Sequence, residues 1–356
     1  MHVGLVIYGS LDTRSGGYLY DRKLVEFLRS QGDTVEIISL PWRNYAAHLI
    51  DNFHVRLPAN LDILIQDELN HPSLIFANRE RHPYPVLSLV HHLRCSELRP
   101  KWQNILYRWV EQKYLQSVDG FIFNSRTTET VVSSLVENRK PSILAYPPTD
   151  RFGEPISEKE ILERAKGQEL RILFLGNLIH RKGLHTLLQA VSLQPFALRI
   201  DAVGSLTSEP LYTKQVRKLI TRKDLSSFVF LHGSLDKEPL VEKLKQAHVL
   251  VVPSSYEGFG IVYLEGMCFG LPAIGTTAGA AGEIITEGVD GFLIEPENAI
   301  ELSEKLQTLN GRRDILLQMS LASRARYLRQ PNWEETAGRI REFLLKQIEE
   351  FPPLSL

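Results

Sequence analysis

The sequence predicts an α/β protein of two Rossmann-like domains with a cleft between them. Its 356 residues exceed one ordinary hydrophobic core and suit two domains. Short apolar runs alternate with segments of helical periodicity, which is typical of parallel sheets covered by helices on both faces. This alternation is interrupted in residues 147–167 and then begins again. Each half is long enough for one Rossmann-like domain.

The overall composition narrows the class of protein. Hydrophobic residues make up 43% of the chain and charged residues 23%, which is the balance of a soluble globular protein. With 41 basic and 42 acidic side chains the net charge is -1, so no global field attracts nucleic acid, and we expect no nucleic-acid partner. The two cysteines, Cys95 and Cys268, are too few for a disulfide framework and fit no metal-binding spacing.

The N-terminus and the apolar runs bear on the location of the protein. The chain begins with a strand-like run rather than with a basic region before an apolar stretch. No run reaches the ~18 apolar residues of a membrane helix. With the low cysteine content, these features predict a cytoplasmic protein.

The first domain is expected to cover residues 1–152. Gly16 and Gly17 follow the first apolar run after a polar loop, and a row at helical spacing begins at Tyr20 and continues with Leu24. A further helix is expected over residues 102–116. Strands are expected over residues 3–7, 34–39, 61–65, 86–90, 120–123 and 142–145.

The second domain is expected to cover residues 153–332. The linker is predicted in residues 147–167, where prolines and the charged stretch 157–166 break the alternation. A long amphipathic helix over residues 333–348 is expected to return to the first domain, which it joins as residues 333–356. Strands are expected over residues 171–175, 198–203, 228–231 and 249–252, with helices over 185–191, 211–220 and 240–248.

One segment carries the clearest chemical signal. The strand that ends at Pro253 is followed by Glu257, by the turn Gly258-Phe259-Gly260, and by a helix that starts at Ile261 and Val262. Free N–H groups at the start of a helix favour an anion, and glycines let a phosphate approach the backbone. Glu265 lies in that helix, so the two carboxylates are expected to bracket one elongated ligand. The spacing alone is equally compatible with a tight turn between two unrelated glutamates.

The spacing Glu257-x7-Glu265 resembles the signature of the GT4 family of retaining glycosyltransferases, which have the GT-B fold. The similarity extends over most of the chain in the expected order. It includes Gly16-Gly17, the stretch from Leu175-Gly176-Asn177 to Arg181-Lys182-Gly183, the stretch Gly279–Ile285 with Gly288 and Gly291-Phe292-Leu293, and Trp333-Glu334.

The resemblance implies roles for individual residues in the second domain. Glu265 would hold the ribose of the donor, and Glu257 with the backbone of 258–260 would contact the donor sugar. Lys182 would stabilise the charge of the departing diphosphate. Many family members carry a second cation, an arginine, where this chain has Asn177, and Arg181 is a candidate substitute. Gly16, Gly17, Ile261, Val262 and Leu235 complete the expected donor-binding set.

A histidine of the first domain is also expected to contact the donor sugar. His91 and His92 follow the strand 86–90, and His91 is the preferred candidate, with His92 as the alternative. Adjacent side chains diverge and no third ligand is signalled, so the pair does not predict a metal site. The resemblance likewise implies no required metal or other cofactor.

The resemblance implies transfer of a hexose from a nucleoside-diphosphate sugar, such as a UDP- or GDP-hexose, with formation of an α-glycosidic bond. The donor is expected on the second domain and the acceptor, a glycan, a lipid-linked sugar or a small molecule, on the first. The alternatives are a non-catalytic sugar-nucleotide-binding protein and a GT-B epimerase. A nicotinamide-dependent oxidoreductase is disfavoured because neither Gly9 nor Gly176 opens a G-x-G-x-x-G pattern.

Two further segments allow two interpretations each. The stretch from Arg94 to Lys113 is rich in basic and aromatic residues, which suits peripheral contact with the inner face of a membrane. However, Glu97 and Glu111 reduce its positive charge, and its aromatic residues are equally suited to a hydrophobic core. The polar run 66–72 suits either an acceptor site at the rim of the cleft or a hydrated loop.

Overall fold

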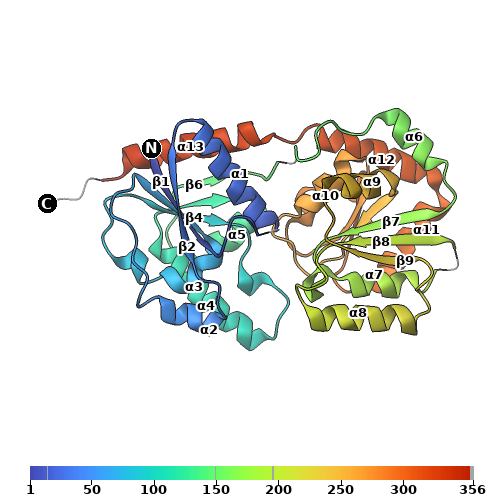
Figure 1. Ribbon diagram of the computed structural model, residues 1–356, viewed down its shortest axis with the longest axis horizontal. Coiled ribbons are helices and arrows are strands. Elements are labelled where there is room, and N and C mark those ends of the chain that lie inside the picture. Colours follow the sequence, from blue (N-terminus) through green and yellow to red (C-terminus); the bar gives the residue numbers. More distant parts are fainter. Residues whose placement is uncertain (14, 149, 195, 353–356) are drawn as a thin grey trace. The chain divides into compact units, whose positions relative to one another are not determined.

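The structure is a computed structural model that describes residues 1–13, 15–148, 150–194 and 196–352. The chain forms two compact units (Figure 1). Unit 1 comprises Met1–Pro148 and Pro331–Leu356, and unit 2 comprises Thr149–Gln330. The sequence placed the corresponding boundaries after residues 152 and 332.

Unit 1 is built on a six-stranded parallel sheet with the strand order β2-β1-β3-β4-β5-β6. Its strands are β1 (His2–Tyr8), β2 (Thr34–Leu40), β3 (Ile63–Asp67), β4 (Val86–Val90), β5 (Gly120–Phe123) and β6 (Ser142–Leu144). Its helices are α1 (Gly16–Ser30), α2 (Tyr45–Asp51), α3 (His71–Leu74), α4 (Lys101–Ser117), α5 (Arg126–Ser133) and α13 (Trp333–Glu350).

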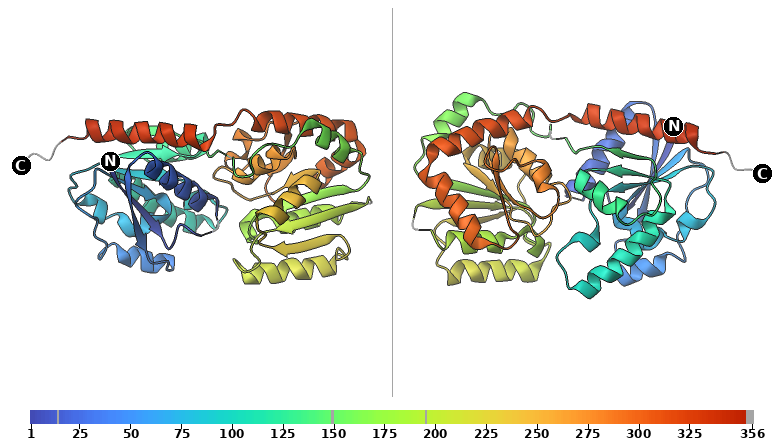
Figure 2. Two further views of the ribbon diagram at one scale, coloured as in Figure 1. Left: turned by 45° about the horizontal axis from the view of Figure 1, so that its top comes forward. Right: turned by 180° about the vertical axis from the view of Figure 1, so that it is seen from behind.

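The closing helix α13 belongs to unit 1 because its apolar face completes the core there. Ala337, Ile340 and Leu344 are fully buried and pack with Tyr20 and Leu24 of α1 in one cluster. Figure 2 shows α13, in red, lying along this unit. The helix begins with a capping box, in which the side chains of residues 332 and 335 satisfy each other's backbone N–H groups. The chain therefore returns to unit 1 through α13.

Unit 2 is built on a second six-stranded parallel sheet with the order β12-β11-β10-β7-β8-β9. Its strands are β7 (Leu170–Leu175), β8 (Leu198–Val203), β9 (Val229–Gly233), β10 (Val249–Val251), β11 (Ala273–Thr276) and β12 (Gly291–Ile294). Its helices are α6 (Glu158–Ala165), α7 (Leu184–Val191), α8 (Pro210–Arg222), α9 (Lys237–Gln246), α10 (Ile261–Cys268), α11 (Ala299–Gly311) and α12 (Arg313–Tyr327).

The charged stretch 157–166 is a helix of unit 2, not part of an irregular linker. Ser157 and Glu160 form a capping box that starts α6. Ile161 is buried, and the guanidinium of Arg164 donates to the backbone carbonyls of Phe269 and Gly270, each at 2.8 Å. The sequence did not predict this helix because most of its residues are charged and only one of them, Ile161, is buried.

Strand β3 lies two residues further along than the sequence predicted, and this changes the meaning of the polar run 66–72. Gln66 and Asp67 pair with neighbouring strands as part of the sheet. Gln66, Asp67, Glu68, Asn70 and His71 are all buried. The amide of Gln66 exchanges two hydrogen bonds with that of Asn78, at 2.6 and 2.9 Å. A hydrated loop is therefore wrong for this run, whereas an acceptor site at the rim of the cleft stays a prediction.

The strand orders locate the positions in each sheet where ligands bind in folds of this kind. In unit 2 the order reverses between β7 and β10, and folds of this kind bind their ligands at such a reversal, at the carboxyl edge of the sheet. In unit 1 the corresponding reversal lies between β1 and β3. The predicted site residues follow these strands and β4, with Leu235 as an exception after β9.

Candidate active site

The loops after β7 and β10 are in direct contact, and a glycine makes this contact possible. Gly183 lies at φ +72°, in the left-handed region, between Lys182 and the first turn of α7. A Cβ atom there would lie 2.1 Å from the carbonyl oxygen of Pro253. The N–H of Ser255 donates to the carbonyl of Arg181 at 2.8 Å and reinforces the contact. Gly183 thus holds the loop that carries Lys182 against the loop that carries Glu257.

We expect Gly183→Ala to lower the stability of unit 2 by about 2 kcal/mol or more. The left-handed conformation costs an alanine roughly 1 kcal/mol, and the Cβ must also displace the backbone of Pro253. Gly288→Ala is the matched control, because Gly288 has a similar φ of +74° but nothing within 4 Å of its Cβ position. Urea unfolding of both variants measures the difference, and equal losses would contradict the contact.

Glu257 is buried in a cationic environment that keeps it ionised. Its Oε1 accepts from the ammonium of Lys182 and from the hydroxyl of Ser254, each at 2.5 Å, and its Oε2 lies 3.9 Å from the guanidinium of Arg181. Burial raises the pKa of Glu257, but Lys182 and Arg181 outweigh burial and bring the pKa down to about 2. The carboxylate is therefore a fixed anion between two cations.

The backbone of Glu257 is held as firmly as its side chain. Its carbonyl accepts from the N–H of Ala280 at 2.8 Å, and the residue forms a parallel bridge with Gly279. A Cβ on Gly279, which lies at φ +85°, would be 2.1 Å from the Glu257 carbonyl oxygen. Gly279 thus allows the backbone of Glu257 to lie where it does. This gives a physical reason why the stretch 279–285 accompanies the segment 257–265 in one sequence.

Lys182 and Arg181 both face Glu257 from the short helix His180–Lys182 after β7. The side chain of Lys182 is 15% exposed, and burial lowers its pKa, which Glu257 partly restores. Arg181 also donates to the carbonyl of Tyr256 at 2.7 Å. The sequence left the direction of Arg181 open, and the structure directs it toward the same carboxylate as Lys182.

The glycine turn before α10 leaves the start of that helix without a side-chain cap. Gly260 caps α10 at φ +94°, and a Cβ there would lie 2.6 Å from the ring of Tyr263. The Phe259 side chain is buried, whereas Gly258, Ile261 and Val262 are partly exposed. Backbone N–H groups, rather than the phenyl ring, are therefore what this turn offers to an anionic ligand.

Glu265 is buried in α10 and is bonded to a residue that the sequence did not single out. Its Oε1 accepts from the guanidinium of Arg151 at 2.8 Å. Burial raises the pKa of Glu265, and Arg151 opposes this rise. Arg151 lies in unit 2, although the sequence assigned it to the first domain.

The remaining predicted donor-binding residues of unit 2 lie on the same edge of the sheet. Asn177 follows β7, and its side-chain oxygen accepts from the N–H of Ser205 at 3.1 Å after β8. Its amide therefore ties the two loops together. Leu235 lies partly exposed in the loop between β9 and α9.

In unit 1, the imidazole of His91 packs against the backbone of Gly17, in the glycine pair that begins α1. A Cβ on Gly17 would lie 3.2 Å from Cδ2 of His91, and Gly16 is the first residue of the helix. The Nε2 of His91 is 3.0 Å from Oδ1 of the fully buried Asp21. His92 instead directs its Nε2 toward Glu97, at 3.1 Å. Of the two histidines, His91 is the one that the structure brings together with the glycine loop.

Asp21 makes His91 a cation over a wide pH range. Burial lowers the pKa of His91, but Asp21, with smaller contributions from Asp67 and Glu68, outweighs burial and raises the pKa to about 9. Burial and then Asp21 raise the pKa of Asp67 to about 7. The Oδ2 of Asp21 is buried without a hydrogen-bond partner.

Two clusters among the described residues have ligand atoms close enough together for a metal ion. Each has its atoms within 4.8 Å of one another, in Asp21, Asp67 and His91, and in Glu68, His71 and Glu111. In the first, the Nε2 of His91 is already bonded to Asp21. The second has Glu111 accepting from the backbone N–H groups of Arg94 and Cys95. Hydrogen bonds within the chain thus already occupy ligand atoms in both clusters.

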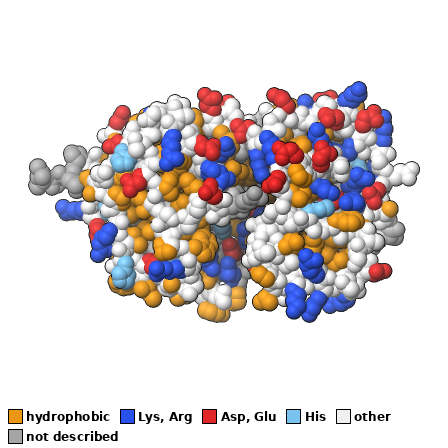
Figure 3. Space-filling view, viewed as in Figure 1, with side chains coloured by type: hydrophobic (Ala, Val, Ile, Leu, Met, Phe, Trp, Pro, Cys, Tyr) orange, Lys and Arg blue, Asp and Glu red, His pale blue; other side chains and the backbone are white. Residues whose placement is uncertain are grey.

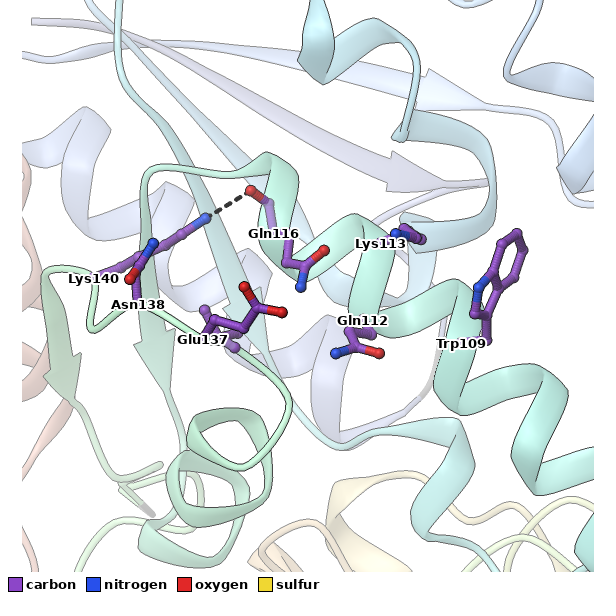
Figure 4. Close-up of a pocket in the computed structure, with 8 residues that line it drawn as sticks. Trp109, Gln112, Lys113, Gln116, Glu137, Asn138 and Lys140 are labelled. Carbon is purple, nitrogen blue, oxygen red and sulfur yellow. Dashed lines mark hydrogen bonds between the residues drawn. The ribbon is translucent and has the colours of Figure 1, made fainter.

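A surface hollow of about 510 Å³ lies elsewhere on unit 1, beside the C-terminal half of α4 (Figure 4). The ammonium of Lys140 closes one side by donating to the carbonyl of Gln116 at 2.9 Å, as the dashed line in Figure 4 marks. None of the predicted site residues is among those that line it, which are Trp109, Gln112, Lys113, Gln116, Val136, Glu137, Asn138 and Lys140.

The sequence missed Ser254, Arg151 and Asp21. Ser254 stands three residues before Glu257 in the same loop, so the local sequence contains the signal for this contact. Arg151 and Asp21 contact their partners across 114 and 70 residues, respectively, so no local pattern indicates them.

Comparisons with known proteins add independent information. The sequence model of the family described as "Glycosyl transferases group 1" matches residues 157–326. An uncharacterized glycosyltransferase of Methanocaldococcus jannaschii is 32% identical over 137 residues, which are 38% of this chain and 37% of that protein. A GDP-mannose-dependent monoacylated alpha-(1-6)-phosphatidylinositol monomannoside mannosyltransferase of Corynebacterium glutamicum is 31% identical over 176 residues, which are 48% of this chain and 45% of that protein. The chain thus spans less than half the length of these curated relatives.

Solved structures match nearly the whole chain. Sucrose-phosphate synthase from Thermosynechococcus elongatus has a TM-score of 0.84 at 19% identity, with 98% of this chain and 100% of that chain covered. HepE of Anabaena in complex with UDP-glucose has a TM-score of 0.73 at 18% identity, with 97% and 100% covered. Residues 157–326, which make up most of unit 2, thus match the group 1 glycosyltransferases, and the chain as a whole has the two-domain, Rossmann-like GT-B fold.

Proposed function

We propose that this protein is a retaining glycosyltransferase of the GT4 type, which transfers a hexose from a nucleoside-diphosphate sugar and forms an α-glycosidic bond. The observation that carries the proposal is the group formed by Lys182, Arg181 and Glu257 where the sheet of unit 2 changes direction. Two cations around one carboxylate leave a net positive charge there. Such a site suits a diphosphate better than a neutral ligand.

The chemistry follows from where charge develops during transfer. As the bond between sugar and diphosphate breaks, the leaving oxygen gains negative charge, and the ammonium of Lys182 and the N–H groups at the start of α10 are fixed donors for it. Glu257 accepts hydrogen bonds from sugar hydroxyls. Glu265, held by Arg151, accepts those of the ribose. We assign the acceptor to unit 1, with His91 as the residue of that unit that acts on the reacting sugar.

The same cations support the proposal that no metal is required for the reaction. A metal ion in a sugar-nucleotide site neutralises the diphosphate. Here Lys182 supplies one positive charge, and Arg181 supplies a second in place of the arginine that Asn177 replaces. The nucleoside of the donor is open between uridine and guanosine. One relative is named for its dependence on GDP-mannose, and one structural neighbour holds UDP-glucose.

A thermal-shift screen against UDP-, GDP- and ADP-hexoses tests the proposal without knowledge of the acceptor. A donor present at 100 times its Kd stabilises the native state by about 2.7 kcal/mol, which for a unit of this size raises the midpoint by about 5 to 10 °C. We expect this shift with one nucleotide class, both with Mg²⁺ and with EDTA. No shift with any donor would remove the proposal, and a shift only with Mg²⁺ would remove its metal-free part.

The alternatives predict different products. A non-catalytic sugar-nucleotide-binding protein would give the same shift but would not release nucleoside diphosphate from the donor. An epimerase would convert the donor or its sugar to an epimer, which ¹H NMR of the reaction mixture detects. The position of Lys182 beside Glu257 favours the transferase, because its ammonium is fixed where it stabilises the charge that develops on the leaving oxygen.

A further inference from the structure

Helix α4 of unit 1 presents a row of large apolar side chains to solvent. Leu98, just before the helix, and Trp102, Ile105, Leu106 and Trp109 are exposed by 61%, 67%, 69%, 47% and 59%. Their spacing of three and four residues places them on one side of the helix. The opposite side, with Val110, Tyr114 and Leu115, packs in the core. We call the exposed side, residues 98–109, the α4 face.

The exposed charges of helix α4 itself are positive. Within α4, all of whose residues the structure describes, Lys101, Arg108 and Lys113 are at least partly exposed. The acidic residue of the helix, Glu111, is fully buried and bonded to backbone N–H groups. Glu97 is paired with Arg99 and His92. Neither acid therefore dilutes the charge of the face in the way the sequence indicated.

The aromatic residues of this stretch separate into two groups. Tyr107 is part of a stack with Arg94, whose guanidinium lies 4.8 Å from the centre of the Tyr107 ring and 5.1 Å from that of Tyr45. Trp102 and Trp109 point outward instead. Figure 3 shows hydrophobic side chains, in orange, interspersed with basic ones, in blue, and acidic ones, in red, over the visible face of unit 1. The core interpretation holds for Tyr107, but not for the two tryptophans.

We propose that the α4 face docks on the surface of an anionic lipid bilayer, with its apolar row in the interfacial region and its basic residues at the headgroups. Tryptophan prefers that region, and an apolar stripe flanked by lysine and arginine is the pattern of a helix that lies in the plane of a membrane. No helix in the described part of the chain is long and apolar enough to cross a bilayer. The contact is therefore peripheral.

A second copy of the chain is a poorer occupant of the α4 face. Two such faces would bring the basic residues of both copies together around an apolar contact, without an exposed acid on either helix to pair with them. Like charges across an interface oppose association. An anionic headgroup layer supplies the missing counter-charge, and each lysine or arginine near such a surface contributes about 1 kcal/mol.

Vesicle sedimentation of the full-length protein tests this proposal. We expect binding to vesicles of equal parts phosphatidylcholine and phosphatidylglycerol, and little binding to phosphatidylcholine alone. Lys101→Gln and Arg108→Gln should each weaken binding about fivefold. The double variant Trp102→Ser/Ile105→Ser should weaken it by at least about tenfold, because binding scales with the apolar area buried.

The control removes apolar side chains of similar exposure from unit 2. Leu211 and Ile300 are exposed by 79% and 67%, so Leu211→Ser/Ile300→Ser should bind vesicles as the unaltered protein does. Quenching of tryptophan fluorescence by brominated lipid gives a second measurement on the unaltered protein. Absence of both sedimentation and quenching would overturn the proposal, as would equal loss in the control. A dimer in sedimentation velocity that Trp102→Ser/Ile105→Ser dissociates, without vesicle binding, would assign the face to a second copy instead.

This test is independent of the proposed transfer reaction, because vesicle binding requires neither donor nor acceptor. A protein that binds no sugar nucleotide but sediments with anionic vesicles would remove the proposed function and keep the α4 face. The reverse outcome would keep the transferase and remove the face.

Discussion

Replacing Lys182 by alanine is expected to slow release of nucleoside diphosphate from the donor by about 10²–10³-fold, the usual cost of removing one fixed donor at a developing negative charge. Two observations explain why the rate should depend so strongly on Lys182. Its ammonium lies 2.5 Å from Glu257, and a Cβ on Gly176 would lie 3.5 Å from its side chain, so its position is fixed before a ligand arrives. Donor affinity should fall less than the rate, because Arg181 remains near the diphosphate.

The control for Lys182→Ala is a lysine of the same unit in a similar ion pair. Lys243 is 19% exposed and lies 2.9 Å from Asp201. Both alanine variants leave a partly buried carboxylate without its ammonium, so both should lose stability. Only Lys182→Ala should lose turnover, measured by coupled detection of the nucleoside diphosphate. Turnover within about threefold of the unaltered enzyme, with the donor bound, would exclude Lys182 from the reaction.

The order of elements and the residues at strand ends were predictable from the sequence because they are local. Apolar runs marked β1, β4 and β5 within one or two residues, and the spacing of Glu257 and Glu265 needed only one strand, one turn and one helix. The ion pair of Glu257 with Lys182 was not predictable in the same way. It depends on the pairing of β10 with β7. Leu175, the last residue of β7, and Val249, the first of β10, are 74 positions apart in the chain, and the two strands become neighbours only in the folded sheet.

The failures of sequence interpretation come from polar groups whose burial is decided by distant partners. The local sequence places Gln66 in a loop, but Asn78 satisfies its amide inside the protein. The local sequence likewise indicates that Glu111 is a surface acid, but the backbone N–H groups of residues 94 and 95 bind it. In both cases the composition of the segment predicts exposure, and hydrogen bonds formed elsewhere in the chain reverse it.

Asp21 was missed for the same reason, and we expect it to control the pH dependence of the enzyme as a positioning residue for His91. The folded-state pKa of His91, about 9, exceeds its ordinary value of about 6.5. The stabilisation from the protonated histidine is therefore complete below about pH 6.5 and is lost as the pH rises through 9. If the reaction requires the imidazolium, kcat of the unaltered enzyme should fall only as the pH approaches 9 and above.

Asp21→Asn removes the largest of the interactions that raise the pKa of His91 and keeps the shape of the side chain. Burial, which lowers the pKa of His91, is then opposed only by Asp67 and Glu68, which raise it. The descending limb of the pH profile should therefore move toward about pH 6.5. The protonated fraction at pH 8, and with it kcat, should fall by up to about 30-fold, whereas near pH 6 the loss should be small. Asp33→Asn is the control, since Asp33 is a buried carboxylate of unit 1 bonded to Arg341. Asp33→Asn should lower the stability of the protein without moving the descending limb of the pH profile of kcat. If that limb stays near pH 9 in Asp21→Asn, the charge of His91 does not enter the reaction.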